Sequence, residues 1–223
     1  MQPGYLDYEG VAISIDFLPT GEFELIQQTI QDYQTFLGSK ETFHNNVALE
    51  KIEKGVLVDL VLYDNKNETI TLAPNLLGSV LLGRSTVHPP FSPDRPAGFP
   101  DEPPEVFADR SGQFSQAVYF KFILAHEITH ALHDGNEAIW QSFRDEFWPS
   151  VPLGCIPFAT YRPGPAKDSD PSLTRHATVQ GLRGDKLQEE VLADAVAAHL
   201  YAPALLGNRY TDWIENTLPT VLK

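Results

Sequence analysis

The sequence predicts an α+β fold, with a small sheet in the N-terminal half and helices through most of the C-terminal half. Three patterns indicate this class. Residues 21–38 carry apolar side chains every three or four positions, which is typical of an amphipathic helix. Residues 47–74 alternate in places and turn at a polar cluster, which favours a β-hairpin or meander. Residues 111–135 and 185–202 are two long helical patterns.

The N-terminal part begins with the amphipathic helix, which is expected to end near Gly38. Its apolar stripe consists of Phe23, Ile26, Ile30, Tyr33 and Leu37. Beyond the hairpin, residues 79–83 are expected to form one more short strand. Residues 85–104 are expected to be a proline-rich loop, because seven of the 18 prolines fall within 89–104 and proline breaks helices. This loop fits a plain connector, and the functional alternative is a flap beside an active cleft.

The C-terminal part is predicted to contain the two long helices and shorter ones. The first long helix has Ser111 or Ser115 as its N-cap. Gly135 suits the left-handed backbone conformation that often ends a helix. A short helix is expected over 136–148, before Pro149.

The remaining C-terminal segments differ sharply in composition. Residues 150–184 are rich in proline, glycine and serine, so an irregular segment is expected there. The next helix has Asp185 as a candidate cap and closes at Pro203. Residues 211–223 form a last amphipathic segment.

Length and charge favour one acidic domain over residues 1–223, with a sheet-containing part (1–110) and a helical part (111–223). The formal charge of −14 would repel phosphate backbones, so nucleic acid is not an expected partner. The most apolar windows, 56–63 and 117–125, are too short to span a bilayer. No signal peptide is visible. We therefore expect a soluble protein that is cytoplasmic, or exported without a visible leader.

The cysteine content limits the kinds of metal site that the chain can build. Cys155 is the single cysteine, so it cannot form an intrachain disulfide or a cysteine-rich metal site. If the chain binds a metal ion, the ligands must be histidines and carboxylates.

The segment His126-Glu127-Ile128-Thr129-His130 provides such ligands. Positions four apart lie on one face of an α-helix, so His126 and His130 can converge on one ion, and neutral imidazole is a preferred ligand of Zn²⁺. Glu127 is rotated by about 100° from His126, so it suits a general base that accepts a proton from a metal-activated water. The pattern alone also occurs on surface helices with two unrelated histidines, but the preceding apolar run supplies the helical context that it requires.

A third ligand is expected from the second long helix. Glu190 and Asp194 are four residues apart in an otherwise apolar stretch. They either form a solvated stripe or face inward, in which case Glu190 binds zinc and Asp194 accepts the second ring N–H of a ligand histidine. Glu189 is the other candidate for the third ligand, but no carboxylate follows Glu189 four residues later. His133 lies about 10 Å along the helix axis from His126, too far for the same ion, and suits a helix C-terminal cation or a local hydrogen-bond partner.

The two blocks HEITH and EVLAD together resemble the glutamate-zincin (gluzincin) branch of zinc metallopeptidases, in which an HExxH helix pairs with a later helix carrying ExxxD or ExxAD. The metzincin pattern is excluded, because His133 and Asn136 stand where it requires Gly and His. The resemblance covers these two helices only and leaves the subfamily open. It implies a zincin-like fold with one Zn²⁺, whose ligands would be His126, His130 and Glu190. Glu127 would be the general base, and Asp194 would accept a hydrogen bond from a ligand histidine. It also implies an edge strand that binds the substrate antiparallel.

Several other polar residues are weaker candidates. A donor to the oxyanion could come from the segment between the two blocks or from just after the second. These candidates are Tyr161, Arg162, Arg175, His176, Arg209 and Tyr210. His199 and Tyr201 lie too far along the second helix to reach the metal, and His44 and His88 have no partner at ligand spacing.

The expected function is therefore a zinc endopeptidase that hydrolyses a peptide or protein substrate. Two alternatives stay open. A non-catalytic module of the same fold would use the acidic surface to dock a basic partner, and a zinc amidase would use the same residues on a non-peptide substrate. The sequence does not indicate the cleavage specificity or the oligomeric state.

Overall fold

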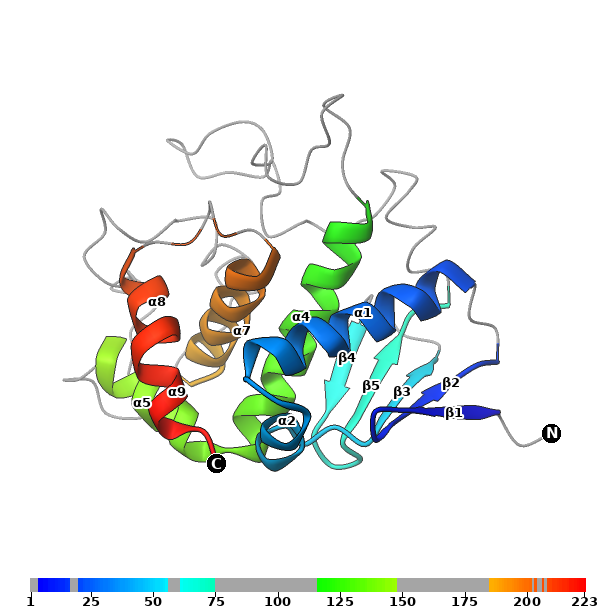
Figure 1. Ribbon diagram of the computed structural model, residues 1–223, viewed down its shortest axis with the longest axis horizontal. Helices are drawn as coiled ribbons and strands as arrows, with labels where there is room; N and C mark the ends of the chain where they lie inside the picture. The colour runs from blue at the N-terminus through cyan, green and yellow to red at the C-terminus, as the bar shows by residue number, and fades with distance from the viewer. Residues whose placement is uncertain are drawn as a thin grey trace, which may run out of the picture.

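The protein is described as a computed structural model covering residues 4–16, 20–55, 61–74, 116–147, 185–201, 203, 206 and 208–223. These residues form a mixed α+β structure, with the sheet in the N-terminal half and a mostly helical C-terminal half (Figure 1). The predicted class is therefore confirmed. No helix in this part of the chain is long and apolar enough to cross a bilayer.

The described residues form a sheet of five strands, of which the prediction covered three. In the order β1-β2-β3-β5-β4 they are Tyr5–Tyr8, Val11–Ser14, Lys51–Lys54, Thr69–Leu72 and Val61–Asp64. The β4–β5 hairpin has the predicted antiparallel pairing. A meander would place β3 beside β4, but β3 instead pairs in parallel with both β2 and β5. As a result β4 lies at the edge of the sheet that the described residues form.

The N-terminal hairpin of β1 and β2 was not predicted. Its two-residue turn consists of Glu9 (φ 55°) and Gly10 (φ 91°), both in the left-handed region that tight hairpins require. This Glu-Gly pair between short strands is the sequence signal that could have identified the hairpin. His44 contacts the turn, with Nε2 2.6 Å from the carbonyl oxygen of Glu9. His44 thus has a local partner away from the metal-binding residues.

The helices lie close to their predicted positions, with one addition. They are α1 (Thr20–Phe36), α2 (Lys40–Asn46), α4 (Gln116–Gly135), α5 (Glu137–Phe147), α7 (Asp185–Tyr201), α8 (Asn208–Asp212) and α9 (Leu218–Val221), with the π-helical turn η4 (Trp213–Thr217) before the last. The helix α2 was missed, although Ser39 is a capping residue whose Oγ accepts the Thr42 amide at 2.9 Å. The last amphipathic segment is divided among α8, η4 and α9.

Two glycines mark helix ends for different reasons. Gly38 follows α1 with φ 92°, as expected of a left-handed exit. Gly135 instead stays helical, which corrects the prediction. A Cβ atom there would lie 2.8 Å from the Ala48 backbone nitrogen. Gly135 is therefore required by the close approach of α4 to the backbone before β3, and not by an unusual φ.

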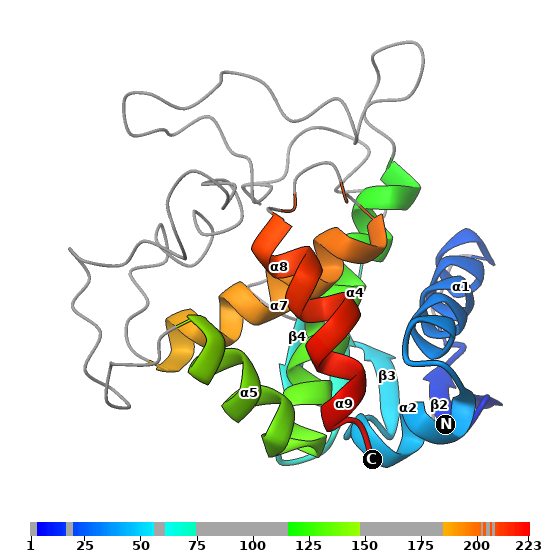
Figure 2. The same cartoon turned by 60° about the vertical axis from the view of Figure 1, so that its left-hand side comes forward.

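One face of the sheet packs against the helices, and α4 lies between the sheet and α7 (Figures 1 and 2). Ile13, Ile52 and Ile70 are aligned across three neighbouring strands and are fully buried. Buried side chains of α4, such as Leu124 and Ile128, belong to the same hydrophobic cluster. The core therefore fixes α4 between strand β4 and helix α7, which is the arrangement that builds the site.

Several predictions lie outside the described residues: the strand over 79–83, the loop over 85–104, the caps Ser111 and Ser115, Pro149, the segment 150–184 with Cys155, and the side chain of Asp185.

Candidate metal centre

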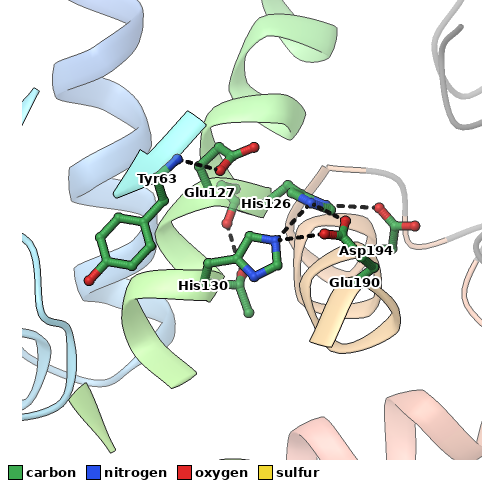
Figure 3. Close-up of polar contacts among 8 residues, drawn as sticks. Tyr63, His126, Glu127, His130, Glu190 and Asp194 are labelled. Atoms are coloured by element: carbon green, nitrogen blue, oxygen red, sulfur yellow. Dashed lines mark hydrogen bonds and ion pairs between the residues drawn. The ribbon is translucent and has the colours of Figure 1, made fainter. Parts of the chain in front are cut away.

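Helix α4 presents both histidines of HEITH on the side that faces α7 (Figure 3). A neighbouring side of this turn is anchored in the core, where the Tyr33 hydroxyl lies 2.7 Å from Thr129 Oγ1. Thr129 Oγ1 also donates to the carbonyl of Ala125 at 2.8 Å. Because both Tyr33 and Thr129 are buried, these contacts hold the rotation of the helix that directs the histidines toward α7.

Helix α7 packs against α4, and many of its buried residues are small. Ala193, Ala195, Ala197 and Ala198 are all fully buried, and alanine gives a helix the least bulky surface apart from glycine. The acidic pair on this helix therefore does not form a solvated stripe. Asp194 is only 1% exposed, and Glu190 has a side chain that is 19% exposed.

Three side chains from the two helices converge at one point. His126 Nε2 lies 3.1 Å from His130 Nε2 and 3.1 Å from Glu190 Oε2. The other carboxylate oxygen of Glu190, Oε1, lies 3.6 Å from His130 Nε2. All three residues offer ligand atoms within 4.8 Å of one another, so the group could hold a metal ion. Of the two candidate glutamates, Glu190 and not Glu189 belongs to this group.

Asp194 lies directly behind the group. Its Oδ1 atom is 2.9 Å from His126 Nδ1. With the proton on Nδ1, the ring donates to Asp194 and its Nε2 lone pair points at His130 and Glu190. The second oxygen, Asp194 Oδ2, is buried and has no hydrogen-bond partner among the residues that the structure describes. A carboxylate buried in this way is stabilised by positive charge nearby, which either an imidazolium or a metal ion would supply.

The charge balance around His126 favours a cation at this point. Burial by itself would lower the pKa of His126, but the hydrogen bonds to Asp194 and Glu190 outweigh it and raise the pKa well above 6.5. In the absence of a metal, this shift favours the protonated form of His126. A metal ion that binds Nε2 must displace that proton, so metal and proton compete for one site.

This competition predicts a pH dependence of the thermal stability. The raised pKa stabilises the metal-free protein below about pH 6.5, and this contribution is lost as the pH rises through the pKa of folded His126. The increase in Tm caused by excess Zn²⁺ should therefore grow with pH. The apparent zinc affinity should rise by about tenfold for each pH unit in which one proton is displaced. Differential scanning fluorimetry between pH 6 and pH 9, with and without Zn²⁺, measures this increase in Tm.

The control for this experiment is His44→Gln, which changes a histidine at the N-terminal hairpin turn. It should keep the pH dependence of the zinc effect, whereas His126→Gln should lose it. An increase in Tm that is the same at all pH values would contradict the proposed competition.

Glu127 extends from α4 in another direction, toward the edge strand β4 (Figure 3). Its Oε2 atom accepts a hydrogen bond from the backbone N–H of Tyr63 at 2.9 Å. The structure thus places the candidate base between the metal-binding group and the sheet edge. Sequence reasoning missed Tyr63, because the donor is a backbone amide that any residue other than proline would supply.

The other candidate residues lie elsewhere. Of the two roles expected for His133, a cation or a local hydrogen-bond partner, the cation is disfavoured, because burial lowers its pKa; the ring packs edge-on against Trp140. His199 contacts Phe36, and the Tyr201 hydroxyl donates to Asp32. Both lie away from the metal-binding group, as expected.

The two oxyanion candidates after α7 are engaged in packing. Arg209 Nε donates to Glu146 Oε1 at 3.0 Å. Tyr210 is buried and stacks on Phe147 with ring centroids 4.5 Å apart. The remaining candidates, Tyr161, Arg162, Arg175 and His176, lie outside the described residues, and so does His88.

Comparison of the chain with protein-family models, with curated proteins and with solved structures found no significant match. The function must therefore be inferred from the geometry and chemistry of these residues.

Proposed function

We propose that this protein is a zinc-dependent endopeptidase with a zincin-like fold of the glutamate-zincin type. One observation carries the proposal. His126 Nε2 lies 3.1 Å from both His130 Nε2 and Glu190 Oε2, and His130 Nε2 lies 3.6 Å from the other Glu190 oxygen, Oε1. A tetrahedral zinc ion with bonds of about 2.0–2.1 Å holds its ligand atoms about 3.3 Å apart. The two separations of 3.1 Å from His126 Nε2 are close to that spacing, and one ligand atom from each of the three residues lies within 4.8 Å of the others.

The donor set supports zinc over other common ions. Two imidazole nitrogens and one carboxylate form a set found in catalytic zinc sites, which use three protein ligands and keep a fourth position open. Hard cations such as Ca²⁺ and Mg²⁺ prefer oxygen ligands throughout. Bound there, zinc would act as a Lewis acid that polarises a carbonyl group and makes water more acidic.

The residues of the chain would then perform the proton transfers. The Glu127 carboxylate accepts a proton from the attacking water and delivers it to the leaving amine. Asp194 keeps the His126 proton on Nδ1, so that Nε2 remains a ligand. The Tyr63 amide orients the Glu127 carboxylate. Each of these groups lies on a helix or strand anchored in the core, which limits their movement during the reaction.

The position of β4 supports a peptide as substrate. This strand is at the sheet edge, and in the described part of the chain no other strand pairs with its outer side. That side faces Glu127, the residue next to the ligand His126, since the Tyr63 amide points to Glu127. An extended peptide that runs along β4, with the Tyr63 amide left to Glu127, would pass next to the group, as the resemblance to zincins implies. Nucleic acid is a poor candidate because the chain carries a net charge of −14.

The experiment that tests the proposal measures zinc content and peptide cleavage in the same preparation. The purified chain should bind one zinc ion and cleave members of a library of unstructured peptides. EDTA should stop the cleavage, and added Zn²⁺ should restore it. A fully zinc-loaded chain that cleaves no peptide would contradict the proposal and favour a binding module or an amidase for non-peptide substrates.

A further inference from the structure

The backbone of strand β4 is directed at the proposed general base. Tyr63 pairs with Ile70 across the β4–β5 ladder. In an antiparallel ladder, residues alternate between pairs that exchange hydrogen bonds and pairs that do not. The Tyr63 amide donates to Glu127 on α4, so it points away from β5, and the amides of Leu62 and Asp64 point toward β5.

The side chain of Tyr63 fixes this amide in place. Its hydroxyl donates to the carbonyl of Ala48 at 2.8 Å and lies 3.2 Å from Asp134 Oδ2, on the last turn of α4. Ala48 is itself tied to α4, because its amide donates to the Ala131 carbonyl at 2.9 Å. Burial and the Asp134 carboxylate raise the pKa of Tyr63, so the hydroxyl keeps its proton. One residue thus joins β4 to α4 at two points, its amide and its hydroxyl.

We infer that Tyr63 is the positioning residue for Glu127: its amide binds the carboxylate, and its hydroxyl holds strand β4 at the distance from α4 that this bond needs. The consequence for catalysis rests on the proposed function. A carboxylate with one oxygen held by an amide has a defined direction for its second oxygen, and a base must be placed to within a fraction of an ångström. The hydrogen bond itself does not depend on the reaction.

Amide hydrogen exchange of the ¹⁵N-labelled, metal-free protein tests this inference. The Tyr63 amide should exchange slowly in the native protein, because Glu127 accepts its hydrogen bond. Glu127→Ala removes the acceptor and should speed the exchange of that amide by about tenfold. The amides of Leu62 and Asp64 should change by less than about twofold, because they face β5. Glu127→Gln should keep most of the protection, since the side-chain carbonyl can still accept.

The hydroxyl is tested with a matched pair of variants. Tyr63→Phe should speed exchange of its own amide by about threefold or more, with a smaller effect on Leu62 and Asp64. Tyr5→Phe is the control, because it removes a hydroxyl that bonds to Glu53 on another strand of the sheet. It should leave the amide of residue 63 unchanged.

Two results would overturn the inference. One is unchanged exchange of the Tyr63 amide in Glu127→Ala. The other is a uniform increase along β4 in Tyr63→Phe, which would mean that the hydroxyl only stabilises the fold. Exchange does not require turnover, so a chain that cleaves no peptide would count against the proposed function and leave this test intact.

Discussion

Glu127→Gln is expected to reduce the kcat/KM of peptide cleavage by about 10²–10⁴-fold, which is the usual contribution of a general acid or base. Glutamine has the shape of glutamate but cannot accept a proton from water at neutral pH. Zinc binding should not change, because the ligand atoms belong to His126, His130 and Glu190. The glutamine carbonyl can also accept the Tyr63 amide, so the edge of the sheet should stay in place.

The measurement combines steady-state cleavage of a peptide from the library with metal analysis by mass spectrometry. The control is Glu137→Gln, the same chemical change at an exposed residue that begins α5. It should keep full activity. If Glu127→Gln cut peptides at the native rate, Glu127 would not be the base. If the Glu127→Gln variant lost its zinc, its low activity would follow from the missing ion. The assignment of Glu127 as a base that is not needed for zinc binding would then be wrong.

Glu190→Gln is expected to weaken zinc binding by more than about 100-fold. Mutation of a group that only hydrogen-bonds to a metal ligand lowers metal affinity by about 10–100-fold, so removal of a ligand itself should lower it further. The change also removes a negative charge 3.1 Å from His126 Nε2, where the ion would bind. The dissociation constant can be measured by competition with a fluorescent zinc chelator at fixed pH.

Glu189→Gln provides the matched control, because it removes the same charge one position earlier on the same helix. Its zinc affinity should stay within about threefold of the native value. Equal losses in the two variants would mean that general charge on α7, and not one ligand, holds the ion. A loss confined to Glu189→Gln would reverse the assignment of the third ligand.

The long helices and the HEITH group could be predicted because helix periodicity is a local property. The spacing of His126 and His130 places them on one side of any α-helix, whatever surrounds it. The pair Glu190 and Asp194 could be recognised for a similar reason, since two acids four apart among alanines stand out on a helix. The structure brings these four side chains together across two helices.

The sheet was harder to predict, because strand pairing depends on residues far apart in the chain. Alternation identified the β4–β5 hairpin, whose strands are joined by a short turn. It could not show that β3 lies beside β5, since a parallel pair has no local turn that marks it. The N-terminal hairpin was overlooked, although Glu9 and Gly10 carry a readable turn signal.

Local pattern is enough to place two histidines and a glutamate on the helix α4, and two acids on the helix α7. It does not distinguish a buried acid from a solvated one, nor a neutral His133 from a charged one, because burial and pKa depend on what other elements cover a residue. Only the packed structure sets Asp194 behind His126 and aims the Tyr63 amide at Glu127. The role of that amide cannot be predicted from the sequence, because every residue except proline carries the same N–H. Only the packing of β4 against α4 gives the Tyr63 amide its partner.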